Sequence, residues 1–164
     1  MKFAAEHTFT APPAAVAGVL CDPDFHRTLD LPDLSRPEIV EHTVDGDSRV
    51  LKLRYEFVGH IDGWAKRIIG GRKLTWLQEL RLDVGTMRGT LTFAAESDPK
   101  RLNGEATVEL TAVDDAQTRR TIEGELHVRV PLVGGKAEGR IVPGLVRRLG
   151  VEADAAAAVL TARD

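Results

Sequence analysis

AEGRIVPGLVRRLGVEADAAAAVL, residues 137–160, is the stretch that decides the fold. Apolar residues recur in it every four positions and mark one stripe of a helix: Ala137, Ile141, Leu145 and Leu149. Pro143 and Gly150 should kink or interrupt this helix, so we expect a long element of two or three pieces that runs to about Leu160. It is the one substantial helix available to cover the rest of the chain.

A period of two dominates residues 38–130, which precede this helix. Alternating apolar and polar side chains between turn residues are typical of an antiparallel meander in which each strand has one solvent-exposed face. The clearest strand is 49–58, and Asp45-Gly46 ahead of it predicts a two-residue turn that puts His42 on the face of Leu51. The segment before Asp45, with Val40, His42 and Val44 on one face, predicts a second strand. Further stripes predict the other four strands of this region: Leu74 to Leu82, Met87 to Phe93, Ala106 to Ala112 and Ile122 to Val130.

The N-terminal segment predicts one more strand and two short helices. Residues 2–9 alternate, with His7 among the apolar side chains of one face. A pair of prolines then ends the strand and begins a short helix over residues 12–21. Asp22 followed by Pro23 resembles the cap and first position of a second short helix.

A break in the alternation at residues 61–70 predicts a short helical crossover that ends at Gly70 and could act as a flap over one end of the sheet. The element order is therefore strand, two short helices, six strands and a long helix. This order predicts an α+β fold in which a curved, seven-stranded antiparallel sheet wraps around the C-terminal helix, as one domain over residues 1–164. Such curling tends to leave a concave, mostly apolar cavity.

Composition excludes several classes of protein. The 164 residues suffice for one core, and 43% hydrophobic with 29% charged residues is ordinary for a globular domain. No segment approaches the roughly 20 apolar residues that span a bilayer, so we expect no membrane insertion. The N-terminus lacks the apolar run of a secretory signal, and the single cysteine, Cys21, allows neither a disulfide framework nor a zinc cluster. We therefore expect a cytoplasmic protein.

Charge gives no reason to expect a nucleic-acid partner, because the formal net charge is -3. Cations do crowd the start of the last helix: Lys136, Arg140, Arg147 and Arg148. This group is either a solvated helix face or an anion-binding patch. The oligomeric state is not readable from the sequence.

The chain resembles the START, pollen-allergen and polyketide-cyclase superfamily, whose members have a helix-grip fold. The resemblance rests on FTAPPAAVAGVLCDPDFH at residues 9–26 and VRVPLVGGKAEGRIVPGLVRRL at residues 128–149, and it covers essentially the whole chain. The combination is most similar to a branch of unknown function found mainly in actinobacteria. The resemblance implies an architecture with functions that range from lipid transfer to ring cyclisation, and no shared catalytic residues.

Motifs that would support chemistry are mostly absent, and we expect no catalytic motif, cofactor or metal. Gly134-Gly135-Lys136 lacks the other residues of a phosphate loop. Asp22, Asp24 and His26 diverge on a helix, which favours capping and solvent exposure. Cys21 lies beside apolar residues, which favours a buried, inert thiol.

The inward face holds the candidate site. His7, His42 and Gln78 are polar among apolar side chains, so they either satisfy one another or orient a ligand. Large apolar side chains point the same way and form either a packed core or a cavity wall. The predicted ligand-binding set is His42, Tyr55, Phe57, Trp76, Gln78, Met87 and Phe93 on the sheet, with Ile141 and Leu145 on the helix.

Three functional hypotheses follow. The first is a non-catalytic protein that binds a hydrophobic small molecule of lipid, polyketide or isoprenoid type, with Trp76 and Tyr55 stacking and Gln78 or His42 fixing a polar end. The second is an enzyme of cyclase or hydratase type in which His7 or His42 acts as general acid or base. The third is a packed interaction module without a cavity.

Overall fold

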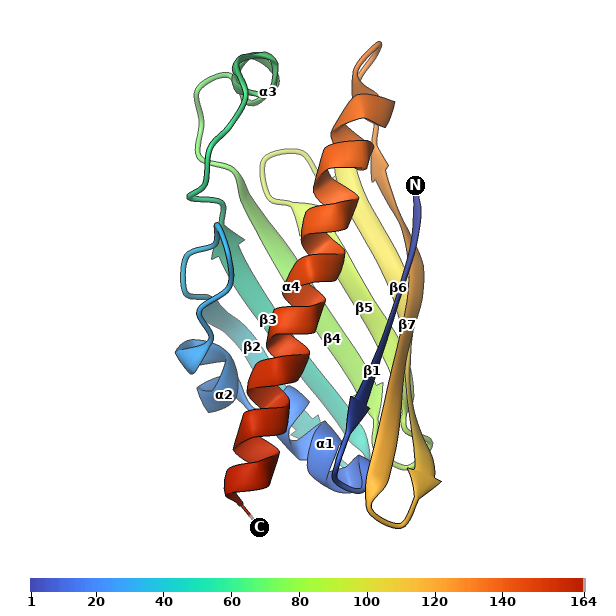
Figure 1. Cartoon of the computed structure of the whole chain (residues 1–164). Coiled ribbons are helices and arrows are strands. Elements are labelled where there is room, and N and C mark those ends of the chain that lie inside the picture. Colours follow the sequence, from blue (N-terminus) through green and yellow to red (C-terminus); the bar gives the residue numbers. More distant parts are fainter. Residues whose placement is uncertain (164) are drawn as a thin grey trace.

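The computed structural model describes residues 1–163 and contains one antiparallel sheet that wraps around a long helix (Figure 1). Its seven strands lie in the order β1-β7-β6-β5-β4-β3-β2. The strands are β1 (Lys2–Phe9), β2 (Glu38–Asp45), β3 (Ser48–Glu56), β4 (Thr75–Asp83), β5 (Arg88–Ala95), β6 (Leu102–Asp114) and β7 (Gln117–Val128). The helices are α1 (Pro13–Leu20), α2 (Pro23–Thr28), α3 (Gly63–Ile69) and α4 (Gly134–Ala162). The α+β helix-grip prediction is confirmed.

The short helices begin and end at the predicted signals. Proline occupies the first turn of both α1 and α2, where a missing N–H costs nothing. The Asp22 side chain caps α2 by accepting a hydrogen bond from the Asp24 N–H at 2.9 Å. Gly70 ends α3 in the left-handed region at a φ of 64°, which glycine adopts without strain.

The prediction that the C-terminal helix is broken into pieces is wrong, because α4 is continuous from Gly134 to Ala162. Pro143 lies inside it and lacks the N–H that would bond to the Gly139 carbonyl. Both residues are on the exposed side of the helix, where water can bind that carbonyl. The missing bond is therefore tolerated without ending the helix.

The β2–β3 hairpin turns one residue later than predicted. Asp45 pairs with Ser48, so the turn residues are Gly46 and Asp47. The face is nevertheless as expected, since His42 pairs with Leu51. His42 is exposed, however, because β2 is an edge strand and α4 packs against β1 and β7 near the other edge of the sheet.

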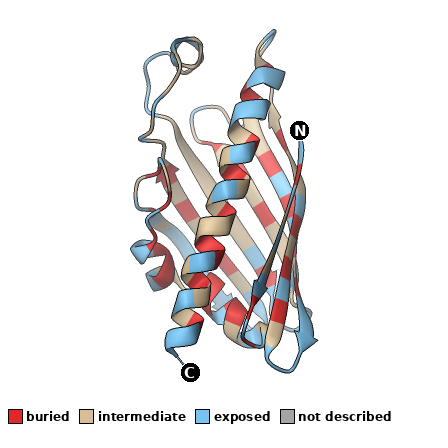
Figure 2. Ribbon diagram, in the orientation of Figure 1, coloured by how far each residue is buried: buried red, intermediate tan, exposed pale blue. Residues whose placement is uncertain are grey.

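The core is divided along α4. The C-terminal half of the helix, through Ala153, Ala156 and Leu160, packs with α1, α2 and the inward residues of β3. The middle of the helix, through Leu145 and Leu149, packs with β1, β5, β6 and β7. Figure 2 shows buried residues concentrated around α1 and on the strands behind α4, whereas the α3 end is intermediate or exposed. The tightly packed end of the fold is thus opposite α3.

Among residues 1–163, no helix is both long enough and apolar enough to cross a membrane.

Candidate functional site

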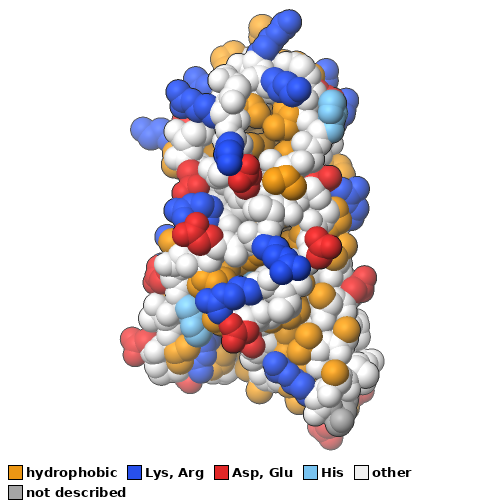
Figure 3. All heavy atoms as spheres, turned by 90° about the vertical axis from the view of Figure 1, so that its left-hand side faces the viewer, with side chains coloured by type: hydrophobic (Ala, Val, Ile, Leu, Met, Phe, Trp, Pro, Cys, Tyr) orange, Lys and Arg blue, Asp and Glu red, His pale blue; other side chains and the backbone are white. Residues whose placement is uncertain are grey.

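A cavity of about 700 Å³ lies between the N-terminal half of α4, α3 and the sheet. Ile141, Leu145 and Leu149 form its wall on α4, while Trp76 and Phe93 form its floor on the sheet. The face of the molecule in Figure 3 is hollowed near the α3 end, with hydrophobic side chains inside a rim that carries charged groups. The volume lies within the range of about 300–1,000 Å³ that small-molecule pockets occupy.

Most of the predicted ligand-binding residues line this cavity: Phe57, Trp76, Gln78, Phe93, Ile141 and Leu145. The remaining members of the predicted set lie elsewhere. His42 is exposed on the edge strand, so its predicted place in the interior is corrected. Tyr55 is 1% exposed and stacks on Trp76, with ring centroids 5.8 Å apart, so it supports the floor from within the core. Met87 has a φ of 57° in the β4–β5 turn, at the end of the sheet away from α3.

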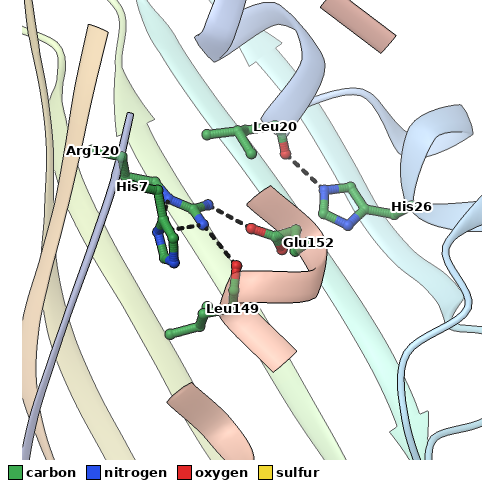
Figure 4. A network of polar contacts seen from close by, with 6 residues as sticks. All are labelled: His7, Leu20, His26, Arg120, Leu149 and Glu152. Atoms are coloured by element: carbon green, nitrogen blue, oxygen red, sulfur yellow. Dashed lines mark hydrogen bonds and ion pairs between the residues drawn. The ribbon is translucent and has the colours of Figure 1, made fainter. Parts of the chain in front are cut away.

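The inner end of the cavity is polar. Gln78 and Glu152 line both the large cavity and a second, buried one of about 30 Å³, which has room for water only. Arg120 on β7 and Glu152 on α4 both line this small cavity and form an ion pair, with Nη1 2.5 Å from Oε1 (Figure 4). Arg120 also donates from Nη2 to the Leu149 carbonyl at 3.1 Å. A charged pair therefore joins sheet and helix at the point where the cavity meets the core.

The protonation states of this network follow from its burial and charges. Burial alone would raise the pKa of the Glu152 carboxyl, but the charge of Arg120 and the hydrogen bond that Arg120 donates hold it below its usual range. Burial, and then the charge of Arg120, lower the pKa of His7. His7 is therefore neutral at pH 7, and its Nδ1 lies 3.1 Å from Arg120 Nη2, as an acceptor.

Sequence reasoning missed Arg120 and Glu152, although a signal for both exists. Arg120 is in phase with the inward residues Ile122 and Leu126 of β7, and Glu152 continues the buried stripe of α4 after Leu149. Two opposite charges in phase with two facing apolar stripes indicate a buried ion pair.

His26 is also misplaced by the sequence analysis, which favoured solvent exposure. It is 3% exposed, and its Nε2 lies 2.7 Å from the Leu20 carbonyl, within hydrogen-bond distance. Within residues 1–163, neither His26 Nδ1 nor the Tyr55 hydroxyl has a hydrogen-bond partner. Cys21 is buried as predicted, and burial raises the pKa of its thiol to about 11, so it is an inert thiol.

The mouth of the cavity carries paired charges. Arg140 on α4 lies 3.1 Å from Asp62, which precedes α3, and Arg147 lies 3.6 Å from Asp33 in the loop after α2. Lys136 stands 5.2 Å from the centre of the Trp64 ring of α3. The segment with α3 is thus held against α4 by polar contacts at the surface.

Residues 1–163 contain no group of three or more His, Cys, Asp or Glu side chains that could hold a metal ion.

Solved structures with the same fold cover nearly the whole chain. The Zhui aromatase/cyclase from Streptomyces sp. R1128 is 16% identical, with 99% of this chain and 94% of that chain covered and a TM-score of 0.69. Norcoclaurine synthase from Thalictrum flavum, in complex with dopamine and hydroxybenzaldehyde, is 16% identical, with coverage of 100% and 88% and a TM-score of 0.63. A START superfamily protein from Mycobacterium smegmatis is 11% identical, with 99% of both chains covered and a TM-score of 0.61.

These identities show a shared fold and nothing further. No curated protein matches the chain. Residues 4–160 match the family described as "Protein of unknown function (DUF2505)". The chain is therefore a member of the DUF2505 family, and it has the helix-grip fold of the START superfamily.

Proposed function

We propose that the protein binds a hydrophobic small molecule of lipid, polyketide or isoprenoid type in the cavity between α4 and the sheet. The observation that carries this proposal is the cavity itself. It has a volume of about 700 Å³, opens to solvent on one side and has aromatic rings along its floor. A helix packed flush against the sheet, as a pure interaction module requires, would leave no such volume. Burial of apolar ligand surface would supply the binding energy, at about 25 cal/mol per Å².

The proposed orientation of the ligand follows from the distribution of polar groups. Phe57, Trp76 and Phe93 would contact the apolar body, since aromatic rings offer large, rigid apolar surfaces. Gln78 lies at the inner end, where its amide can donate to or accept from a neutral polar group of the ligand. Glu152 beside it is already paired with Arg120.

The enzymatic hypothesis receives no such support. It required His7 or His42 inside the cavity, but His42 is exposed and His7 contacts Arg120 outside the cavity lining. His60 lines the cavity at its mouth, with a side chain that is 84% exposed. A general acid or base needs to be within hydrogen-bond reach of a sequestered substrate, and neither predicted histidine is placed to be so.

The direct test is native mass spectrometry of the purified protein, followed by denaturation and extraction of small molecules. We expect a stoichiometric hydrophobic adduct, or, for protein purified empty, saturable binding of an apolar fluorescent dye. A clean apo mass together with no dye binding would contradict the proposal.

A cavity-filling variant locates the binding. Ile141→Trp places a large ring in the cavity, so dye affinity should fall at least about tenfold. Ala158→Trp adds the same ring to an exposed position of α4 away from the cavity and serves as the matched control. Equal affinities for the two variants would place the dye outside the cavity.

A further inference from the structure

Among the described residues that line the cavity, one arginine has no carboxylate partner. Three carboxylates line it, and each pairs with its own arginine: Asp33 with Arg147 at 3.6 Å, Asp62 with Arg140 at 3.1 Å and Glu152 with Arg120 at 2.5 Å. Arg148 lines the same cavity, and within residues 1–163 no carboxylate lies within 4.0 Å of its guanidinium. The wall of the cavity therefore carries an unbalanced positive charge at this position.

The Arg148 side chain is held in place by three neighbours. Its Nε donates a hydrogen bond to the Pro32 carbonyl at 3.1 Å, and its guanidinium carbon lies 5.9 Å from the centre of the Phe57 ring. It also lies against Gly144, where a Cβ would be 3.4 Å from Nη1 and 3.6 Å from Nη2. Phe57 and Gly144 also line the cavity. The guanidinium is thus positioned by the Pro32 carbonyl, the Phe57 ring and the backbone of α4.

Two donor groups of Arg148 remain available. In the described part of the chain, Nη1 and Nη2 have no hydrogen-bond partner, and neither atom is sealed from solvent or cavity. Burial lowers the pKa of Arg148, Asp33 opposes that effect, and Arg147 adds to it. Because Nη1 and Nη2 form a planar fork, they match the two oxygens of a carboxylate or phosphate.

We propose that the ligand is an amphipathic oxyanion whose apolar body fills the cavity and whose carboxylate or phosphate binds Nη1 and Nη2 of Arg148. The inference rests on the proposed binding function and adds the chemical class of the ligand. It also assigns different roles to adjacent arginines, since Arg147 already pairs with Asp33 and Arg148 is free to bind. The anionic group would lie at the mouth of the cavity and the apolar body toward Gln78.

The test compares probes that share one chain and differ in the head group: decanoate, decyl phosphate and decanol, each titrated calorimetrically. We expect the unmodified protein to bind the better of the two anions at least about tenfold more tightly than decanol, since hydrogen bonds to charged groups are the stronger ones. Arg148→Gln should abolish that preference by weakening the binding of the anions much more than the binding of decanol. Arg147→Gln, at an exposed and paired neighbour, is the matched control and should retain it.

Each other outcome refutes a different statement. Equal affinity of the unmodified protein for decanol and both anions would refute the anionic ligand class and leave the apolar cavity site standing. Equal loss of preference in both glutamine variants would refute a specific site at Arg148 in favour of diffuse positive charge. Failure of all three probes to bind would refute the inference together with the proposed function.

A second variant guards against a folding defect in Arg148→Gln. Arg148→Lys keeps the positive charge but not the planar fork of two N–H donors, so it should retain part of the preference for the anions.

Discussion

Breaking the buried ion pair should cost the protein much of its stability. Glu152→Gln keeps the shape and one acceptor oxygen of the side chain but removes the negative charge next to Arg120. The Arg120 side chain is only 3% exposed and that of Glu152 9%, so water cannot replace the lost charge. Removal of one partner of such a pair costs about 3–5 kcal/mol, and we expect the lower end, about 3 kcal/mol, because the Leu149 carbonyl still accepts from Arg120. That is a large part of a typical total of about 5–15 kcal/mol.

Urea unfolding at pH 7 measures this cost, and Arg120→Met with Glu152→Leu is the control. The double variant removes both charges, so it should lose far less stability than Glu152→Gln alone. Acid should reproduce the loss of stability seen in Glu152→Gln. The pKa of Glu152 is lowered in the folded protein, so the carboxylate stabilises the fold fully above the ordinary carboxyl pKa. This stabilisation disappears as pH falls through the pKa of Glu152 in the folded protein. A loss below about 1 kcal/mol for Glu152→Gln would refute the claim that this pair holds α4 on β7.

Other substitutions test other parts of the structure. The pKa of His7 is lowered in the folded protein, so the unfolded chain binds the proton more readily and the free energy of unfolding falls as pH drops below about 6.5. His7→Gln should therefore flatten the decline of the melting temperature below that pH. An unchanged decline would contradict this reasoning. Leu160 is 5% exposed, so Leu160→Ala should lower the free energy of unfolding in urea by about 2–5 kcal/mol. Ile141 faces the cavity, so Ile141→Ala should lower it by only about 1 kcal/mol. Similar costs for the two variants would contradict the difference in packing. Arg140→Gln removes the exposed ion pair with Asp62, which holds the α3 segment against α4. Dye release, measured by stopped flow, should become up to about fivefold faster, while the melting temperature stays the same because an exposed pair contributes little stability. An unchanged release rate would show that α3 does not gate the cavity.

The fold was largely predictable because its signals are local. Alternation identified every strand, proline and Asp22 marked the short helices, and Gly70 marked the end of α3. The expected break in α4 was wrong because a proline on the exposed side of a packed helix can leave its unpaired carbonyl to water. Local propensity alone does not report which side of the helix faces solvent.

The site was less predictable because it depends on what covers each inward position. Alternation placed His42 and Trp76 on one face, but only Trp76 lies where α4 and α3 enclose a volume. Charge spacing grouped Arg147 with Arg148 as one surface cluster, whereas the fold pairs one with Asp33 and turns the other toward Phe57. Such distinctions arise from contacts between segments far apart in the sequence.

The division of α4 into two differently packed halves has a consequence for how this protein can diversify. Substitutions at partly exposed positions of the N-terminal half that face the cavity, such as Ile141, reshape the enclosed volume at modest energetic cost. The buried residues of the C-terminal half, by contrast, pack against α1 and the inner side of β3 and tolerate little change: Ala153, Ala156 and Leu160. Mutations in the N-terminal half of α4 can therefore change ligand specificity, while the C-terminal half keeps the fold stable.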